Sequence, residues 1–489
     1  MQRSTKQILA FLAVSVTVLV LTFYLGTHKN MTGQPYEAIE AYRQAHPEKN
    51  VTYSLTVTGG NRELKLNESS REVKLTEAAQ LDSLTAQAQY LQGLSEIRLE
   101  GFTPEALPLA GLMRAFPETA IVYDAVSVFG LTCPAETTAL DLSAVTPETL
   151  PEAQAALQVL PRLEQLNLNG PDGKSSLSLE DAAALQAARP ELDIAYATTL
   201  FGQEISTDME EIRYFQVDIG DEGLEQFRLL LPMMHNCRQL TLDWCGTSNE
   251  ATAQLREDFP DTKVVWRVFM GQFNCLTDTY KVWATWSVSN DQAQVLKYCN
   301  EVKYLDLGHN HIRDTSFVAN MPDLEVAILA IGDEESCEGL RHCPKLEYLE
   351  IFSTKITDIS PLAECKELKH LNISNLKIDD ITPLYGLDKL ERMFCTLNGR
   401  IPKEQQDRFR ELHPDCYTIF LYGGDPSDFK WRYYDGFPGG TQKVPRYALL
   451  TVQFGYDIWD FSQYPKGHVR YEINSVEDAL EHRRQEKEA

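Results

Sequence analysis

Apolar residues recur every 22 positions between residues 302 and 395. In each of five units, further apolar residues stand three and five positions after the first one. This spacing places alternate side chains on one face of an extended chain, so it predicts a short strand at the start of every unit. The five units begin at Val302, Leu324, Leu346, Leu368 and Leu390.

A second phrase predicts a return segment after the strand. Residues 355–362 read KITDISPL, and residues 377–384 read KIDDITPL. Ser360 is suited to cap a helix, and Pro361 suits the first position of a short helix or 3₁₀ turn. One unit is therefore a strand, a turn and a helical return. Because a single unit cannot bury its own apolar face, the units are expected to stack into a solenoid.

This register resembles the leucine-rich repeat family, in the 22-residue bacterial form of internalin-like surface proteins. Residues 302–397 carry the resemblance, and residues 346–387 carry it best. The turn asparagine of the family is present at Asn310, but the matching positions of the next three units hold Gly332, Thr354 and Leu376. The resemblance implies an α/β leucine-rich repeat solenoid, with a parallel sheet on one face and short helices or 3₁₀ turns on the other, and a function in binding.

A longer period continues the repeat towards the N-terminus. Five segments each combine a helix end broken by proline, an acidic turn and a strand that ends in an aromatic residue, and a glycine follows each one. The first four prolines lie 70, 73 and 70 residues apart, a distance of about three coils. We therefore expect irregular, longer repeats over residues 36–300 and regular repeats over residues 301–420. The five prolines are Pro47, Pro117, Pro190, Pro260 and Pro414.

Side chains between the apolar strand positions point away from the solenoid core. In the regular repeats many of them are aromatic or aliphatic, and contiguous apolar residues on an exposed sheet usually mark a contact surface. We predict that a protein or another surface ligand binds there. Two alternatives stay open: the C-terminal segment or a neighbouring coil covers the patch, or the solenoid is a structural spacer without such a surface. The predicted binding residues are Tyr304, Val326, Ile328, Tyr348, Phe352 and Phe394.

An uncharged apolar run over residues 8–26 follows Arg3 and Lys6. As a helix it spans about 30 Å, enough to cross the core of a bilayer. No small-x-small cleavage site follows the run, so we expect an uncleaved transmembrane anchor. The alternatives are a cleaved signal peptide, which leaves a secreted protein, and a buried core helix. The flanking charges predict a cytoplasmic segment at residues 1–7 and, beyond a linker at residues 27–35, an extracellular location for the rest of this single-pass membrane protein.

The C-terminal region differs in composition from the repeats. Residues 421–465 contain twelve aromatic residues, and residues 466–489 form a charged tail. Since the terminal repeats of a solenoid need a cover, we expect residues 421–465 to cap the last coil. An aromatic patch that binds a sugar or a peptide is one alternative. The other is an enzyme site that acts on cell-wall material through Asp435, Asp457 and Asp460.

Charge and motifs narrow the range of functions. The formal net charge of −26 repels phosphate groups, so nucleic acid is not expected as a partner. The sequence has no phosphate-binding loop, nucleophile elbow, metalloprotease motif or zinc-type cysteine spacing, so we expect no catalytic residue and no cofactor. His309 and His311 are expected on opposite sides of a turn, a placement that does not predict a metal site.

Two cysteines occupy equivalent positions in adjacent coils. Cys343 and Cys365 share a core column with Met321 and Leu387, so we expect two buried thiols. A disulfide between the two cysteines is the alternative, because equivalent atoms of neighbouring coils lie about 5 Å apart. Cys395 replaces an aliphatic residue in the strand pattern and is also expected in the core.

Overall fold

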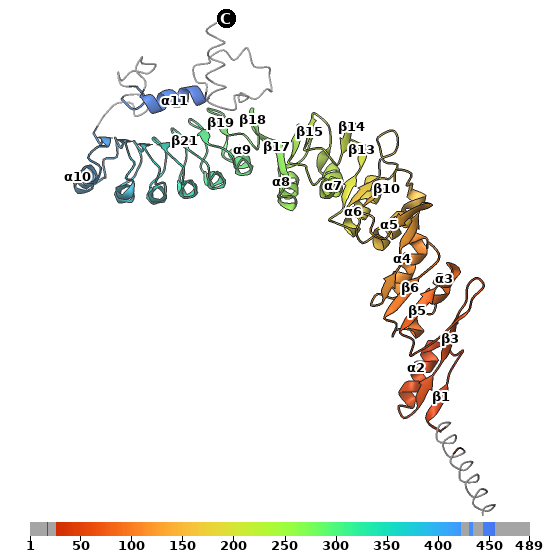
Figure 1. The fold of residues 1–489 in the computed structure, drawn as a ribbon. Helices are drawn as coiled ribbons and strands as arrows, with labels where there is room; N and C mark the ends of the chain where they lie inside the picture. Colours follow the sequence, from red (N-terminus) through yellow and green to blue (C-terminus); the bar gives the residue numbers. More distant parts are fainter. Residues whose placement is uncertain (1–16, 18–25, 422–429, 434–443, 455–489) are drawn as a thin grey trace, which may run out of the picture. The chain divides into compact units, whose positions relative to one another are not determined.

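The computed structural model describes residues 17, 26–421, 430–433 and 444–454 (Figure 1). The chain divides into two compact units, one made of residues 1–209 with 226–236 and the other of residues 210–225 with 237–489. Both units alternate short strands with helices, and the parallel strands with their helical returns form a mixed α/β fold of the leucine-rich repeat type.

The predicted anchor at residues 8–26 lies outside the described residues, apart from residues 17 and 26. The predicted cytoplasmic segment at residues 1–7 and the charged tail at residues 466–489 lie outside them as well. In the part of the chain that the structure describes, no helix combines the length and the apolar character needed to cross a membrane.

Most strands pair in parallel with the strand of the next coil. Residues 28–30, in the segment predicted as a linker, already form one of them, so the ladder begins before residue 36. The parallel strands are β1 (His28–Asn30), β2 (Asn50–Thr52), β5 (Glu72–Leu75), β6 (Glu96–Leu99), β7 (Ala120–Val122), β10 (Ala139–Asp141), β11 (Gln165–Asn167), β12 (Asp193–Ala195), β15 (Glu211–Phe215), β16 (Gln239–Asp243), β17 (Lys263–Met270), β19 (Lys281–Trp283), β20 (Tyr304–Asp306), β21 (Val326–Ile328), β22 (Tyr348–Glu350), β23 (His370–Asn372), β24 (Arg392–Phe394) and β25 (Tyr417–Ile419).

Apart from α11, the helices form the return segments of the coils. The α-helices are α2 (Tyr36–Ala45), α3 (Ala79–Thr85), α4 (Ala106–Ala115), α5 (Leu150–Val159), α6 (Leu179–Ala188), α7 (Gly220–Leu230), α8 (Asn249–Asp258), α9 (Asn290–Ala293), α10 (Lys403–Leu412) and α11 (Pro445–Phe454). The 3₁₀ helices are η1 (Ala88–Tyr90), η2 (Pro147–Thr149), η3 (Leu231–Met233), η4 (Gln294–Tyr298), η5 (Ser316–Asn320), η6 (Glu338–His342), η7 (Ser360–Glu364) and η8 (Thr382–Gly386). Each proline phrase of the sequence separates a helix from a strand as predicted, for example α6 from β12.

The period of about 70 residues is a three-stranded parallel sheet followed by an antiparallel hairpin. The sheet β5–β6–β7 precedes the hairpin β8–β9, and the sheet β10–β11–β12 precedes the hairpin β13–β14. The three coils per period were predicted, but the hairpins were not. Their signal is the glycine after each proline phrase. Phe129 and Gly130 both have positive φ, at 50° and 75°, as a two-residue hairpin turn requires. The hairpin strands are β3 (Ser54–Val57), β4 (Leu64–Asn67), β8 (Ala125–Val128), β9 (Leu131–Pro134), β13 (Ala197–Leu200), β14 (Gln203–Ser206) and β18 (Phe273–Leu276), which pairs with β17.

The regular repeats form the seven-stranded parallel sheet β19–β25, with the 3₁₀ helices η5 to η8 among their returns (Figure 1). From β20 to β24 the register follows the 22-residue period: Tyr304 lies beside Val326, Val326 beside Tyr348, and Tyr348 beside His370. The intervening residues point inward and are fully buried, as the sequence predicted. This core column contains Leu305, Ala327, Leu349, Leu371 and Met393.

The side chain that caps each return differs from the predicted one. Ser360 was expected to cap η7, but the backbone N–H of Ser360 donates instead to Asp358 Oδ1 at 2.8 Å. One coil later, the N–H of Thr382 donates to Asp380 Oδ1 at 2.9 Å. An aspartate two positions earlier accepts this bond in a local Asx turn, which explains why the repeated phrase contains Asp before Ile-Ser/Thr-Pro.

Candidate functional site

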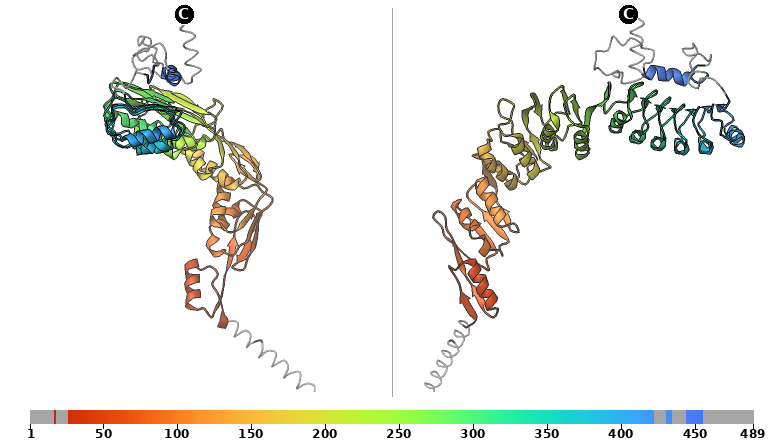
Figure 2. Two further views of the ribbon diagram at one scale, coloured as in Figure 1. Left: turned by 90° about the vertical axis from the view of Figure 1, so that its left-hand side faces the viewer. Right: turned by 180° about the vertical axis from the view of Figure 1, so that it is seen from behind.

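A C-terminal strap, defined as residues 430–433 and 444–454, covers the outward face of the β19–β25 sheet (Figures 1 and 2). In α11, Tyr447, Leu450 and Phe454 stand at helical spacing and are buried on the side that faces the sheet. Trp431 is buried between Tyr348 and Phe394, with ring centroids 5.7 and 5.2 Å away. The sheet residues of this apolar cluster are Val326, Ile328, Tyr348 and Phe394, with Trp283, Tyr304 and Ile419 at its margin.

Glu350 is the polar centre of this contact. It occupies an outward position on β22, and its side chain is completely buried beneath the strap. The carboxylate accepts hydrogen bonds from Trp431 Nε1 at 2.8 Å and from Arg432 Nε at 3.0 Å. Arg432 Nη2 and the Tyr348 hydroxyl donate to the same carboxylate. Because a buried charge is tolerated only when it is paired and hydrogen-bonded, Glu350 selects the one strap position that supplies these donors.

Polar contacts also hold α11 at both of its ends. Near the beginning of the helix, an Arg446 Nη1 atom lies 2.7 Å from a carboxylate oxygen of Glu347. Near its end, Lys281 Nζ donates to the backbone carbonyl of Gln453 at 2.8 Å. The strap is therefore held at β19 as well as at β22, and its contacts extend along the sheet.

The covered face contains two basic groups with shifted pKa values. Burial lowers the pKa of Lys281 to about 8. Burial, together with the nearby Arg446 and Arg392 cations, lowers the pKa of His370 to about 3, so His370 is neutral at physiological pH. The 3.4 Å approach of His370 Nε2 to Glu391 is therefore a contact of a neutral ring and not an ion pair at that pH.

The strap covers five of the six predicted binding residues. Tyr304, Val326, Ile328, Tyr348 and Phe394 belong to the cluster or its margin. Phe352 is also buried, on the turn after β22, but it is not part of the cluster. The prediction that this patch is exposed is wrong, and its alternative, cover by the C-terminal segment, is confirmed. Ligand binding by these residues stays a prediction.

Residues 421–465 were predicted to cap the last coil, and those domain bounds stay a prediction. The described residues 430–433 and 444–454 lie along the sheet face and reach the last coil at Ile419 of β25. α10 and β25 form that coil, and Phe409 of α10 fills it. The outward apolar residues of six strands offer the strap more apolar contact than one coil end does, so the strap lies along the sheet face. The predicted enzyme carboxylates Asp435, Asp457 and Asp460 lie outside the described residues.

The sequence prediction did not include Glu350, Glu347 or Lys281. The available signal was a set of charged residues in outward positions of an otherwise apolar patch. A second signal was the adjacent Trp431 and Arg432 in the aromatic segment, which offer the donors that a buried carboxylate needs.

The cysteines and histidines have structural positions. Cys343 and Cys365 are free and buried, and burial raises the pKa of each thiol to about 12. The prediction of buried thiols is confirmed for both, and Cys395 is buried as well. The His309 ring stacks on Trp286, with centroids 4.1 Å apart. Over the described ranges, no group of three or more His, Cys, Asp or Glu side chains is placed to hold a metal ion.

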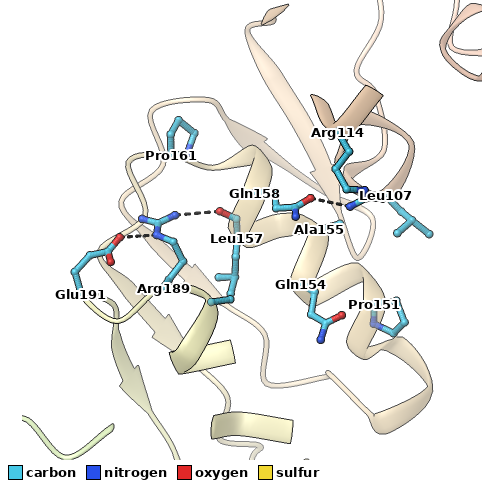
Figure 3. A pocket seen from close by; sticks show the side chains of 11 residues that line it. Leu107, Arg114, Pro151, Gln154, Ala155, Leu157, Gln158, Pro161, Arg189 and Glu191 are labelled. Atoms are coloured by element: carbon cyan, nitrogen blue, oxygen red, sulfur yellow. Dashed lines mark hydrogen bonds and ion pairs between the residues drawn. The ribbon is translucent and has the colours of Figure 1, made fainter. Parts of the chain in front are cut away.

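The first unit has a hollow of about 780 Å³ lined by residues of α4, α5 and the end of α6 (Figure 3). Its arginines are engaged by the chain itself. Arg114 donates to Gln158 Oε1 at 2.8 Å, and Arg189 donates to the carbonyl of Leu157 at 3.0 Å and pairs with Glu191. An arginine that binds the last carbonyls of α5 stabilises the end of that helix, so the polar groups of this hollow have a structural role.

The family model described as "Leucine Rich repeats (2 copies)" matches residues 344–386, and the one described as "Leucine Rich repeat" matches residues 298–316. No curated protein sequence matches the chain.

Several solved structures are similar to the chain. An internalin (inlF) from Listeria monocytogenes is 16% identical, with 80% of this chain and 90% of that chain covered and a TM-score of 0.25. A leucine-rich repeat protein of Leptospira interrogans is 15% identical, with 72% and 90% covered and a TM-score of 0.27. The functional domain of InlJ from Listeria monocytogenes is 11% identical, with 71% and 60% covered and a TM-score of 0.23. Superpositions with scores this low carry no inference about function.

Proposed function

We propose that this chain, which carries leucine-rich repeats of the bacterial, internalin-like type, is a membrane-anchored extracellular protein that binds a protein ligand. Proteins built from these repeats typically mediate protein–protein interaction. The proposed binding surface is the outward face of the β19–β25 sheet, and the proposed role is recognition without catalysis.

The occupation of this face by the chain's own strap supports the proposal. The face accommodates an aromatic ring between Tyr348 and Phe394 and an arginine at Glu350. It also accommodates an amphipathic helix, since α11 packs Tyr447 and Leu450 against it. These are the features of a peptide-binding groove, in which a few buried aromatic and arginine anchors provide most of the affinity.

An external ligand then competes with the strap for the same surface. A ligand segment with an adjacent aromatic residue and arginine satisfies Glu350 in the same way as Trp431 and Arg432 do. The apparent affinity of such a ligand is lowered by the fraction of molecules in which the strap occupies the face. The strap thus occupies the proposed binding surface with the same kinds of side chain that we expect in the ligand.

Binding of the strap in trans tests whether the face is a binding surface. We expect a chain that ends at residue 421 to bind a synthetic peptide of residues 430–454, measured by isothermal titration calorimetry. Tyr348→Asp places a charge in the apolar patch and is expected to weaken binding by at least about 2 kcal/mol, or roughly thirtyfold. Leu412→Asp, a substitution at an exposed position of α10, is the matched control and should leave binding unchanged.

The same reagents identify a physiological partner. In a pull-down from surface extracts with the chain that ends at residue 421, we expect the peptide to displace a protein that binds this face. The Tyr348→Asp variant should not capture that protein. A partner captured equally by the Tyr348→Asp variant, or unaffected by excess peptide, would show that another surface performs the binding.

We further propose that residues 8–26 anchor the chain in the cell membrane, with residues 27–489 outside. The run is uncharged and follows basic residues, which favour the cytoplasmic side. We expect the full-length chain to stay in the membrane fraction after alkaline carbonate extraction, and protease added to intact cells to degrade it. A mature protein that begins after residue 26, found by N-terminal sequencing, would instead establish secretion after signal cleavage.

A further inference from the structure

A cavity of about 430 Å³ lies in the second unit at the end of the four-stranded sheet β15–β18. Its lining comes from three successive strands and the turns that follow them, and it does not include the face covered by the strap. Its volume lies within the range of about 300–1,000 Å³ that is usual for small-ligand sites. The lining residues used below are Gln216, Asp218, Trp244, Arg267 and Phe269.

Two aromatic side chains form an exposed wall of this cavity. Trp244 is 40% exposed and Phe269 is 43% exposed, and their rings meet edge to face with centroids 4.8 Å apart. Edge-to-face packing fixes both rings and still leaves apolar ring surface in contact with water. Exposed aromatic rings at a cavity indicate a ligand site more strongly than scattered exposed aliphatic residues do. The reason is that a ligand which covers their remaining apolar surface removes it from water, and this is favourable.

The coil geometry does not require a tryptophan at position 244. Trp244 has a positive φ of 59°, in the left-handed region that bulky residues rarely adopt. Turns of later coils place Ile331, Ser353, Asn375 and Leu397 in the same region, at φ values between 54° and 61°. Residues of different size and polarity therefore satisfy this conformation, so the turn does not select a tryptophan. The indole of Trp244 instead contacts Phe269, and the Arg267 Cζ atom lies 5.8 Å from its ring centroid.

The floor of the cavity is polar and its charge is mostly balanced. Arg267, a buried residue of β17, is held by Asp243, with its Nε atom 2.5 Å from Oδ1 and its Nη2 atom 2.9 Å from Oδ2. Arg267 also donates to Asn274 Oδ1 at 2.6 Å. Because this ion pair is neutral as a whole and Asp218 adds a negative charge at the rim, the cavity disfavours anionic ligands.

Two polar side chains at the rim are available to a ligand. Within the described part of the chain, the side chains of Gln216 and Asp218 have no hydrogen-bond partner. An amide and a carboxylate together offer donors and acceptors to hydroxyl groups. The cavity thus combines an apolar wall with hydroxyl-binding groups and has no surplus positive charge.

We propose that this cavity binds a neutral carbohydrate, a pyranoside ring with equatorial hydroxyl groups, stacked on Trp244. In such a ring the axial C–H groups form an apolar face that matches an indole, while the hydroxyl groups point outward from the ring edge. The apolar face packs on Trp244 and Phe269, and the hydroxyl groups reach Gln216 and Asp218. This activity goes beyond the proposed protein binding and does not depend on it.

Titration of the full-length chain with cellotetraose and with chitotetraose, followed by tryptophan fluorescence and calorimetry, tests the proposal. These probes carry β-linked rings with equatorial ring substituents and have no charge. We expect at least one to bind, with an affinity lowered about tenfold or more by Trp244→Ala and several-fold by Asp218→Ala. Circular dichroism of each variant establishes that it is folded.

Trp286→Ala is the matched control. Trp286 is also exposed, at 71%, and also has a positive φ, but it stacks on His309 and does not line the cavity. We expect this variant to bind the sugar as the wild type does. The proposal is overturned if neither sugar binds, or if a sugar binds with the same affinity to the folded Trp244→Ala variant.

Discussion

Replacement of Glu350 by alanine is expected to release the strap from the sheet and to leave the repeats folded. The carboxylate of Glu350 is the acceptor for Trp431 Nε1 and for Arg432 Nε and Nη2. Its removal leaves the Arg432 guanidinium without its ion-pair partner beneath the strap, and loss of one partner of a buried pair costs about 3–5 kcal/mol. The coil itself is unaffected, because Glu350 points outward from β22 while Leu349 fills the core.

Hydrogen–deuterium exchange measures this effect directly. In Glu350→Ala we expect the amides of α11 to exchange at least about a hundredfold faster, which corresponds to a loss of roughly 3 kcal/mol, while those of β21 to β23 keep their protection. Glu367→Ala is the matched control, because Glu367 pairs with Lys389 at 2.6 Å in a partly exposed position and does not contact the strap. Unchanged protection of α11 in Glu350→Ala would show that the apolar cluster alone holds the strap.

A double substitution separates the charge from the packing. Glu350→Met combined with Arg432→Met removes both members of the ion pair and is expected to recover part of the strap's protection. Replacement of a buried pair by apolar residues of similar size is often neutral or stabilising, whereas removal of one partner is costly. If the α11 amides of the double variant exchange as fast as those of Glu350→Ala, the charged pair itself contributes net energy to the contact between the strap and the sheet.

Replacement of Glu334 by isoleucine is expected to stabilise its coil strongly at alkaline pH. Glu334 occupies a column that contains Ile312 and Ile356 in the adjacent coils, and all three side chains are buried. Among the residues that the structure describes, neither carboxylate oxygen of Glu334 has a hydrogen-bond partner. Burial raises the pKa of this carboxyl to about 8. Isoleucine restores the repeat pattern and removes a polar group without a partner.

The sign of the pH dependence follows from the raised pKa. Below about pH 4.5 the carboxyl is protonated in both the folded and the unfolded state, so the folded state pays no ionisation penalty. As pH rises towards 8, only the unfolded state ionises readily, and the wild type loses about 4 kcal/mol of stability through this group. Glu334→Ile should abolish this loss and gain about that amount at pH 8.

Exchange rates of the amides of β21 and β22 between pH 5 and 8, corrected for intrinsic rates, give the local free energy of opening. Glu334→Gln is the matched control. It cannot ionise, so it should remove the pH dependence, but it keeps a polar group without a partner and should gain less stability than isoleucine. If the wild type shows the same local stability at both ends of this pH range, Glu334 has a partner that the folded structure gains in solution.

The sequence determined the repeat itself. The strands β20 to β24 pair with one another at intervals of 22 residues, and the inward column was correct at every position from Leu305 to Met393. The proline phrases correctly separated helices from strands. These features can be predicted from the sequence because they depend on contacts within a coil or between adjacent coils. The same packing requirement applies to every coil, so the same residue types recur at a fixed interval.

Only the tertiary structure decided what covers the sheet. Glu350 meets Trp431 across 81 residues, and Lys281 meets Gln453 across 172. Each of these pairs occurs once, at a separation that no period predicts. The sequence also does not distinguish an outward apolar residue that faces water or a ligand from one that the chain's own strap covers. The cavity beside Trp244 is of the same kind, since β15, β16 and β17 bring its residues together only when the sheet has formed. Local periodicity determines the solenoid, and single long-range contacts determine which of its surfaces are covered and where a cavity forms.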